Sequence, residues 1–213
     1  MKTERLFSID IARAICIILV VIGHYLPDNS PDWYLTINKV IYAFHMPLFM
    51  FVSGYVYWAT QKPVKYKKFV WIKFQRLMIP YYFISIVVIV IKIITEKRLW
   101  VPAPVTYSAF YEMLYLPVAG AFLWFVFALF IIFLIIPFFN TRKRLSVFLL
   151  LSLVLFFVQI PFPKVFCLEQ FRMYLLYFSL GCAFFEWTNI RKFIDKTHFL
   201  FVLCVFVGLY III

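Results

Sequence analysis

The chain has 213 residues, of which 66% are hydrophobic and 23% aromatic, and its mean hydropathy is +0.97. Soluble domains contain about 45–50% apolar residues, so this composition excludes a single water-facing globule and indicates a polytopic membrane protein. The formal net charge is +12. Because the basic residues lie between apolar runs and not in a separate basic domain, membrane topology and anionic lipid explain them, and no nucleic-acid partner is expected.

The first apolar run, about 7–26, is long enough to cross a bilayer but contains Asp10, Arg13 and His24. A charge at the centre of such a segment costs roughly 2.5–3.5 kcal/mol on insertion scales, so these residue types usually face a protein interior or a water-filled cavity. Arg13 and His24 are eleven positions apart, which is close to three helical turns, so they share one face about 16 Å apart. Asp10 precedes Arg13 by three positions and is placed to pair with it.

The other apolar runs predict an all-α fold, a polytopic transmembrane helical bundle of six complete spans and a partial seventh. After the first span they lie at about 34–58, 78–94, 121–139, 145–160, 171–187 and 198–213. The stretch 107–118 is too short to cross and is interpreted as interfacial or re-entrant. Since the last run is still apolar at Ile213, we expect one membrane-embedded domain, 1–213, that is incomplete at its C-terminus.

The segment 61–76, between the second and third predicted spans, carries six basic residues and no acid. Aromatic and aliphatic residues alternate with the bases, a pattern typical of an amphipathic segment at the membrane interface. The positive-inside rule then places this segment and the N-terminus on the cytoplasmic side.

The four cysteines show no CxxC spacing and lie in or beside apolar runs; they are Cys16, Cys167, Cys182 and Cys204. This placement favours small buried apolar side chains and no metal site.

Five motifs, in order along almost the whole chain, resemble those of the acyltransferase-3 family of integral-membrane acyltransferases. They are Arg13 and His24 separated by ten residues, FHMPLFMFVSGY at 44–55, KFQRLMIPYY at 73–82, LWFV at 123–126 and YFSLGC at 177–182. The resemblance implies about ten spans in a bacterial inner membrane. It also implies transfer of an acyl group, commonly acetyl, from acyl-CoA to a hydroxyl of a sugar or cell-envelope glycan.

The resemblance also implies roles for residues on the first and third spans. His24 is the expected general base, since a neutral imidazole can accept the proton of an attacking alcohol. Arg13 is expected to pair with Asp10, to contact CoA phosphate, or both. Lys73 and Arg76 are expected either to contact the donor's phosphates or to act only as topological anchors. Lys73 stands where many members have arginine, and it lacks the bidentate fork of a guanidinium.

His45 and Glu112 are candidates for binding the acceptor. His45, close to Pro47 in the second span, is expected to orient the acceptor, to hydrogen-bond His24, or to satisfy a backbone group released by the proline. Glu112, like Glu169, is expected to bind a sugar hydroxyl or to be solvated at the interface. Gly54 and Gly181 are interpreted as residues that permit close helix packing and not as residues that take part in the chemistry.

Two other functions fit the same residues. A transporter or flippase would use Asp10, Arg13 and His24 to line a polar path, and a truncated remnant would be inactive. The pattern contains no signal for the identity of the acceptor or for the oligomeric state.

Overall fold

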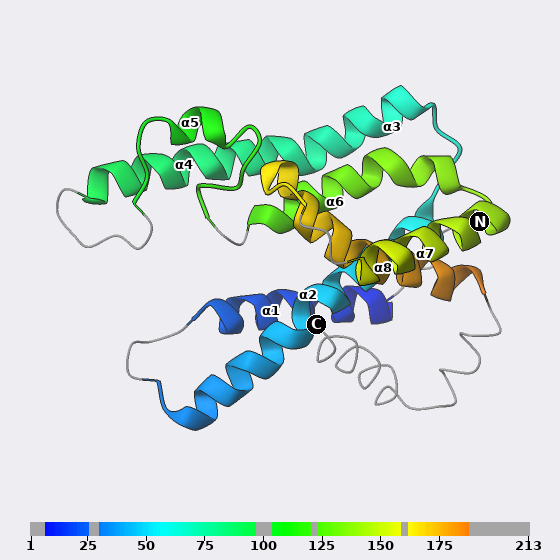
Figure 1. The fold of residues 1–213 in the computed structure, drawn as a ribbon, viewed down its shortest axis with the longest axis horizontal. Helices are drawn as coiled ribbons and strands as arrows, with labels where there is room; N and C mark the ends of the chain where they lie inside the picture. The colour runs from blue at the N-terminus through cyan, green and yellow to red at the C-terminus, as the bar shows by residue number, and fades with distance from the viewer. Residues whose placement is uncertain (1–6, 26–29, 97–103, 121–122, 159–161, 188–213) are drawn as a thin grey trace. The chain divides into compact units, whose positions relative to one another are not determined.

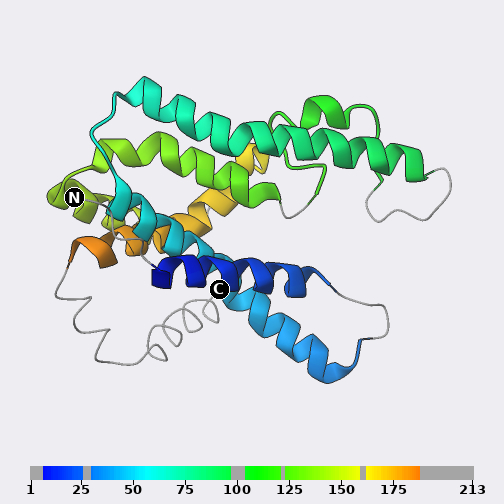
Figure 2. The same cartoon turned by 180° about the vertical axis from the view of Figure 1, so that it is seen from behind.

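The computed structural model describes residues 7–25, 30–96, 104–120, 123–158 and 162–187. Within these ranges every regular element is helical, so the predicted all-α class is confirmed. The chain divides into two compact units, one formed by 1–61 with 176–213 and the other by 62–175. Helix α8 contributes residues to both units. Figures 1 and 2 show the ribbon from opposite sides.

Each of the first six predicted spans corresponds to a helix, and the seventh, 198–213, lies outside the described residues. The elements are α1 (Phe7–His24), α2 (Asp32–Thr60), α3 (Tyr66–Lys73), the π turn η1 (Phe74–Met78), α4 (Ile79–Glu96), α5 (Ala109–Glu112), α6 (Trp124–Ile135), η3 (Ile136–Phe139), α7 (Arg142–Phe157), η4 (Val165–Cys167) and α8 (Leu168–Glu186). As predicted, the stretch 107–118 contains no span, since α5 is a single helical turn.

Two helices in the described ranges are long and apolar enough to cross a membrane, judged by length and composition. They are Asp32–Thr60, with mean hydropathy 1.4, and Tyr66–Thr95, with mean hydropathy 2.4. Two shorter apolar helices cover Ala14–Gly23 and Trp124–Phe139. The count of six spans and a partial seventh therefore stays a prediction.

The basic segment before the third predicted span is joined to that span. From Tyr66 to Glu96 the chain is helical without a break, and Figures 1 and 2 show α3 and α4 as one rod. Within η1 the Ile79 N–H bonds to the Phe74 carbonyl, five residues back. Pro80 has no N–H to donate to the carbonyl four residues earlier, and a π turn at this point absorbs the irregularity without ending the helix.

In the first unit, α2 and α8 touch backbone to backbone at two glycines. A Cβ added to Gly54 would overlap the Phe178 carbonyl oxygen, and one added to Gly181 would overlap the Phe51 carbonyl oxygen. The buried Cys182 thiol also donates to the Gly54 carbonyl at 3.3 Å. Only residues without a side chain permit this approach, so the interpretation of Gly54 and Gly181 as packing residues is confirmed.

Further contacts of α2 and α8 lie beyond the glycines. The Trp58 indole N–H donates to the Glu186 carboxylate at 2.8 Å. The rings of Tyr55 and Phe185 meet edge to face, with centroids 5.3 Å apart. The polar contact and the aromatic contact together fix the register in which the two helices lie side by side.

In the second unit, α6 is the central helix. It packs against α3, η1, η3 and η4, and Figures 1 and 2 both show it beside the rod of α3 and α4. Tyr81 of α4 donates its buried hydroxyl to the carbonyls of Met113 and Leu116, at 2.9 and 3.2 Å. This hydroxyl holds the segment around α5 against α4.

Arg172, near the start of α8, joins that helix to the end of α7. Its guanidinium donates to the carbonyls of Leu155, Phe156 and Val158 at 2.8–3.3 Å and pairs with Glu169 at 2.6 Å. The last carbonyls of a helix have no partner within it, so Arg172 serves as a side-chain cap for α7. The hydrogen bond from Arg172 holds the pKa of Glu169, which precedes the predicted sixth span, below its usual range, although burial acts in the opposite direction.

The glycine contact predicts that Gly54→Ala and Gly181→Ala each destabilise the protein by about 1–3 kcal/mol, because the added methyl group meets backbone that cannot yield. An unobstructed Gly→Ala change in a helix should instead stabilise by up to about 1 kcal/mol. Gly23→Ala is the matched control, since its Cβ would meet the Ile41 side chain at 3.3 Å and not a carbonyl. Thermal unfolding in detergent measures all three; equal losses would contradict the prediction.

The ion pair predicts that Arg172→Gln lowers the free energy of unfolding by on the order of 2 kcal/mol, since three carbonyls and a carboxylate lose their donor. The pKa of Glu169 is lowered in the folded state, so its contribution is present above the unfolded value of about 4.5 and is lost as the pH falls below it. The difference between wild type and Arg172→Gln should therefore narrow below about pH 4.5. Denaturant titrations across this range measure it, with the exposed Arg142→Gln as control; a pH-independent difference would refute the assignment.

Candidate active site

The C-terminal end of α1 is held by two side chains of α2. Tyr34 donates its hydroxyl to the Tyr25 carbonyl at 2.5 Å and lies 3.3 Å from the Ile22 carbonyl. The buried Asn38 side-chain amide donates to the Gly23 carbonyl at 2.8 Å. Carbonyls at a helix end lack intrahelical partners, so Tyr34 and Asn38 of α2 serve as side-chain caps for this end of α1.

His24 lies between the capped residues Gly23 and Tyr25. Its backbone is therefore fixed on both sides by contacts with α2. Helix α1 is uninterrupted from Phe7 to His24. The backbone positions of Arg13 and His24 are therefore about three turns and 16 Å apart along one helix, as expected. The side chains of Asp10, Arg13 and His24 lie outside the described part of the structure, and the pairing of Asp10 with Arg13 stays a prediction.

One face of α2 meets α1. Tyr34, Asn38, Ile41 and His45 follow each other at helical spacing, and a Cβ at Gly23 would lie 3.3 Å from the Ile41 side chain. His45 is 2% exposed, and its Nδ1 lies 2.7 Å from the Ile41 carbonyl oxygen. Because a carbonyl only accepts hydrogen bonds, Nδ1 carries the proton, and in the neutral ring Nε2 is the basic nitrogen.

His45 lies between the levels of Arg13 and His24. It follows Asn38, which marks the level of Gly23, by seven residues, or about 10 Å along α2. Since α1 and α2 run in opposite directions, this displacement leads back towards Arg13. Three roles are expected for His45, and one of them is a hydrogen bond to a backbone group released by Pro47. The structure shows a backbone contact, but the acceptor is the Ile41 carbonyl and not the carbonyl four residues before Pro47.

Lys73, Arg76 and Glu112 belong to the second unit. The Lys73 ammonium lies 3.7 Å from the centroid of the Phe133 ring and 5.4 Å from that of Phe69, which is cation–π geometry. Arg76, in η1, is exposed, and across the described ranges its guanidinium has no recorded hydrogen bond or ion pair. Arg76 is thus available to an anion, whereas Lys73 already has aromatic partners.

The two acidic candidates differ in their surroundings. Glu112 is half-buried on α5, and its carboxylate has no recorded partner among the residues that the structure describes. Glu169 is paired with Arg172, so its carboxylate has a protein partner, and its role as a sugar ligand stays a prediction. In the same described ranges no three His, Cys, Asp or Glu side chains gather as metal ligands. Cys16, Cys167 and Cys182 are buried, as predicted, and Cys204 lies outside the described residues.

Sequence reasoning missed Asn38, Tyr34 and Arg172. Asn38 had a readable signal, because a polar amide seven residues before His45 shares a face with it in an otherwise apolar helix. Arg172 had a weaker signal, the three-residue spacing to Glu169. Its three carbonyl partners come from another helix and have no local signature.

Comparison with known proteins supports the motif-based resemblance. The sequence model of the acyltransferase domain matches residues 6–213. The nodulation protein NolL of Mesorhizobium japonicum is 32% identical over 160 residues, which is 69% of this chain and 39% of that protein. NolL of Sinorhizobium fredii is 36% identical over 85 residues, 38% of this chain and 23% of that protein.

The chain thus spans less than two fifths of the length of either of these relatives. No solved structure matches it. Because the family match covers nearly the whole chain and includes Arg13, His24 and the basic segment at Lys73 and Arg76, the protein belongs to the acyltransferase-3 family of acyltransferase domains.

Proposed function

We propose that the protein is a membrane-bound O-acyltransferase that moves an acyl group, acetyl in the simplest case, from acyl-CoA to a hydroxyl of a sugar or cell-envelope glycan. In this proposal the protein lies in a bacterial inner membrane with its N-terminus in the cytoplasm, and residues 1–213 belong to a single membrane-embedded domain. The observation that carries the proposal is the capped end of α1, where Asn38 and Tyr34 fix the backbone on both sides of His24.

His24 acts as the general base in this proposal. Its neutral imidazole accepts the proton of the acceptor hydroxyl while the oxygen attacks the thioester carbonyl. The tetrahedral intermediate then collapses, the carbon–sulfur bond breaks, and the CoA thiolate leaves and takes up the proton. A base must be held to within a fraction of an ångström for such a transfer. The hydrogen bonds to the Gly23 and Tyr25 carbonyls hold the backbone of His24 in this way.

Arg13, Lys73 and Arg76 are the proposed donor-binding residues. The guanidinium of Arg13 suits phosphate through paired hydrogen bonds, either alone or while Asp10 orients it. Arg76 is the stronger of the two candidates on the basic segment because it is exposed and uncommitted in the described ranges. Lys73 would have to leave the face of Phe133, 3.7 Å away, to bind an anion, so its contribution should be smaller.

His45 and Glu112 are the proposed acceptor-binding residues. His45 is buried on the α2 face that meets α1, at a level between Arg13 and His24. With its Nδ1 proton on the Ile41 carbonyl, Nε2 is the accepting nitrogen of the neutral ring. Glu112 has an uncommitted carboxylate within the described ranges and suits a sugar hydroxyl in the same way.

His24→Ala should abolish acyl transfer while membrane insertion stays intact. Purified full chain in proteoliposomes is supplied with radiolabelled acetyl-CoA and a panel of hydroxyl-bearing glycans, and labelled product and released CoA are measured. His198→Ala is the control, because it removes the same side chain from a residue outside every motif. Full activity of His24→Ala would remove its role as base; accumulation of glycan in vesicles without acyl-CoA would favour a transporter instead.

Asn38→Asp should lower kcat about tenfold or more with little change in KM for acyl-CoA, since it keeps the shape of the side chain but loses the N–H that fixes the Gly23 carbonyl. Thr36→Val is the matched control, because the Thr36 hydroxyl bonds to the Asp32 carbonyl of its own helix and not to α1 within the described residues. The pH dependence of kcat should shift in Asn38→Asp and not in Thr36→Val. Loss of thermal stability without a kcat effect would assign Asn38 to packing alone.

A further inference from the structure

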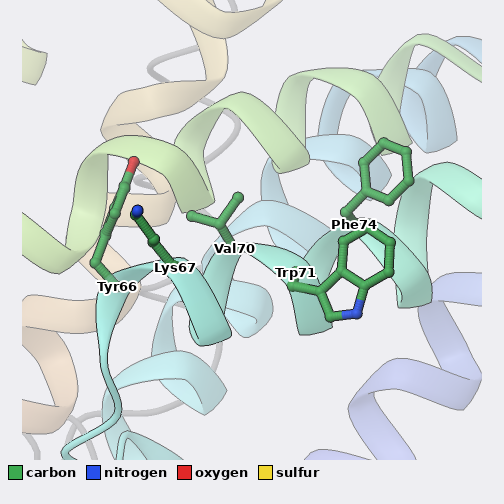
Figure 3. A pocket seen from close by; sticks show the side chains of 5 residues that line it. All are labelled: Tyr66, Lys67, Val70, Trp71 and Phe74. Atoms are coloured by element: carbon green, nitrogen blue, oxygen red, sulfur yellow. The ribbon is translucent and has the colours of Figure 1, made fainter.

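Five side chains of the basic segment line a pocket of about 320 Å³ in the second unit: Tyr66, Lys67, Val70, Trp71 and Phe74. Their spacing places them on one face of a continuous helix. Figure 3 shows Tyr66 and Lys67 at one end of this row, Val70 in the middle, and Trp71 and Phe74 at the other end. The pocket thus has a cationic end and an apolar end.

The apolar end is built from rings that the fold holds in place. Trp71 and Phe74 stack with their planes 10° apart and their centroids 5.7 Å apart, and Phe74 in turn meets Phe130 of α6. Trp71 is nevertheless 57% exposed. A flat, preorganised aromatic wall of this kind suits a chain of methylene groups, because little entropy is lost in ordering it.

The cationic end is not neutralised by the protein. Across the described ranges Lys67 has no recorded hydrogen bond or ion pair, and the chain contains no acid from 61 to 95. Lys65 and Lys68, its neighbours in sequence, are also exposed. Lys73 differs, since its ammonium faces the Phe133 ring. The ligand that complements the exposed lysines is an anion.

Tyr66 marks the polar boundary of the pocket. Its hydroxyl is already bonded to the Leu134 carbonyl at 3.0 Å, and its ring packs against Phe138, so it shapes the pocket and does not offer a free donor. The helix that begins here, Tyr66–Thr95, is apolar enough to cross a membrane. The start of such a helix is where lipid headgroups lie, and an amphipathic basic segment with exposed tryptophan is suited to that depth.

We propose that this pocket is a binding site for an anionic phospholipid of the bilayer. The phosphate lies at Lys67, and one acyl chain runs along Val70, Trp71 and Phe74. Inorganic phosphate would leave the aromatic wall in water, and a zwitterionic lipid would leave the lysines without a net counter-charge. The site is separate from His24 in function, so its occupancy does not depend on acyl transfer.

Native mass spectrometry of the full chain, titrated with phosphatidylglycerol or phosphatidylcholine, tests the headgroup. Lys67→Gln should weaken phosphatidylglycerol binding about fivefold, as expected for one lysine near an anionic phosphate, and should leave phosphatidylcholine binding unchanged. Lys143→Gln, at an exposed lysine of α7, removes the same charge elsewhere. Equal effects of the two variants, equal affinity for the two lipids, or displacement of phosphatidylglycerol by millimolar inorganic phosphate would each overturn the proposal.

A second measurement tests the apolar end in the protein with its lysines intact. Brominated acyl chains quench tryptophan on contact. The quenching difference between wild type and Trp71→Phe in vesicles should be larger with brominated phosphatidylglycerol than with brominated phosphatidylcholine at equal bromine content. Equal differences for the two lipids would show that Trp71 meets bulk bilayer only and would refute a specific site.

Discussion

The backbone contact between α2 and α8 is the constraint on which the first unit depends. Because Gly54 and Gly181 let the helices touch, α2 is fixed along its C-terminal half. In its N-terminal half, before Pro47, Tyr34 and Asn38 contact the end of α1, and His45 follows them at helical spacing. The backbone on both sides of the proposed base is held by the contacts of Tyr34 and Asn38 with the end of α1. Gly54 and Asn38 thus each fix α2 to a neighbouring helix, the first to α8 and the second to α1.

The candidate residues are divided between the two units. Asp10, Arg13, His24 and His45 belong to the unit built on α1 and α2, and Lys73, Arg76 and Glu112 belong to the other. Each unit therefore carries one or more of the proposed donor-binding residues and one of the proposed acceptor-binding residues. Each unit organises its own part by local contacts: a cap in one, and the packing of α3 on α6 in the other.

Much of the fold was predictable from hydropathy, because a long apolar run in a membrane protein satisfies its backbone only as a helix. Helix α7 starts at Arg142, three residues before the predicted 145, because the Thr141 side chain caps it. Threonine is a preferred residue at this position, so the sequence contains a signal for the earlier start. The continuity of α3 with α4 was not predictable. The closely spaced lysines of 61–76 are typical of a loop, and Pro80 is typical of the first turn of a new helix. The caps by Asn38 and Arg172 depend on which helices become neighbours, and that is a property of the tertiary structure.

The π turn before Pro80 has a consequence for the phase of the helix. An α-helix turns by 100° per residue. A π turn contains one extra residue, and the helix that follows keeps the orientation it would have had without that residue. The faces of 66–73 and of 79–96 are therefore offset relative to a regular helix. Without that offset, the side of the basic segment on which Tyr66 and Phe74 contact α6 would be rotated by about a quarter of a circle relative to the faces of 79–96. The π turn thus sets how the side chains of the basic segment are oriented relative to those of 79–96.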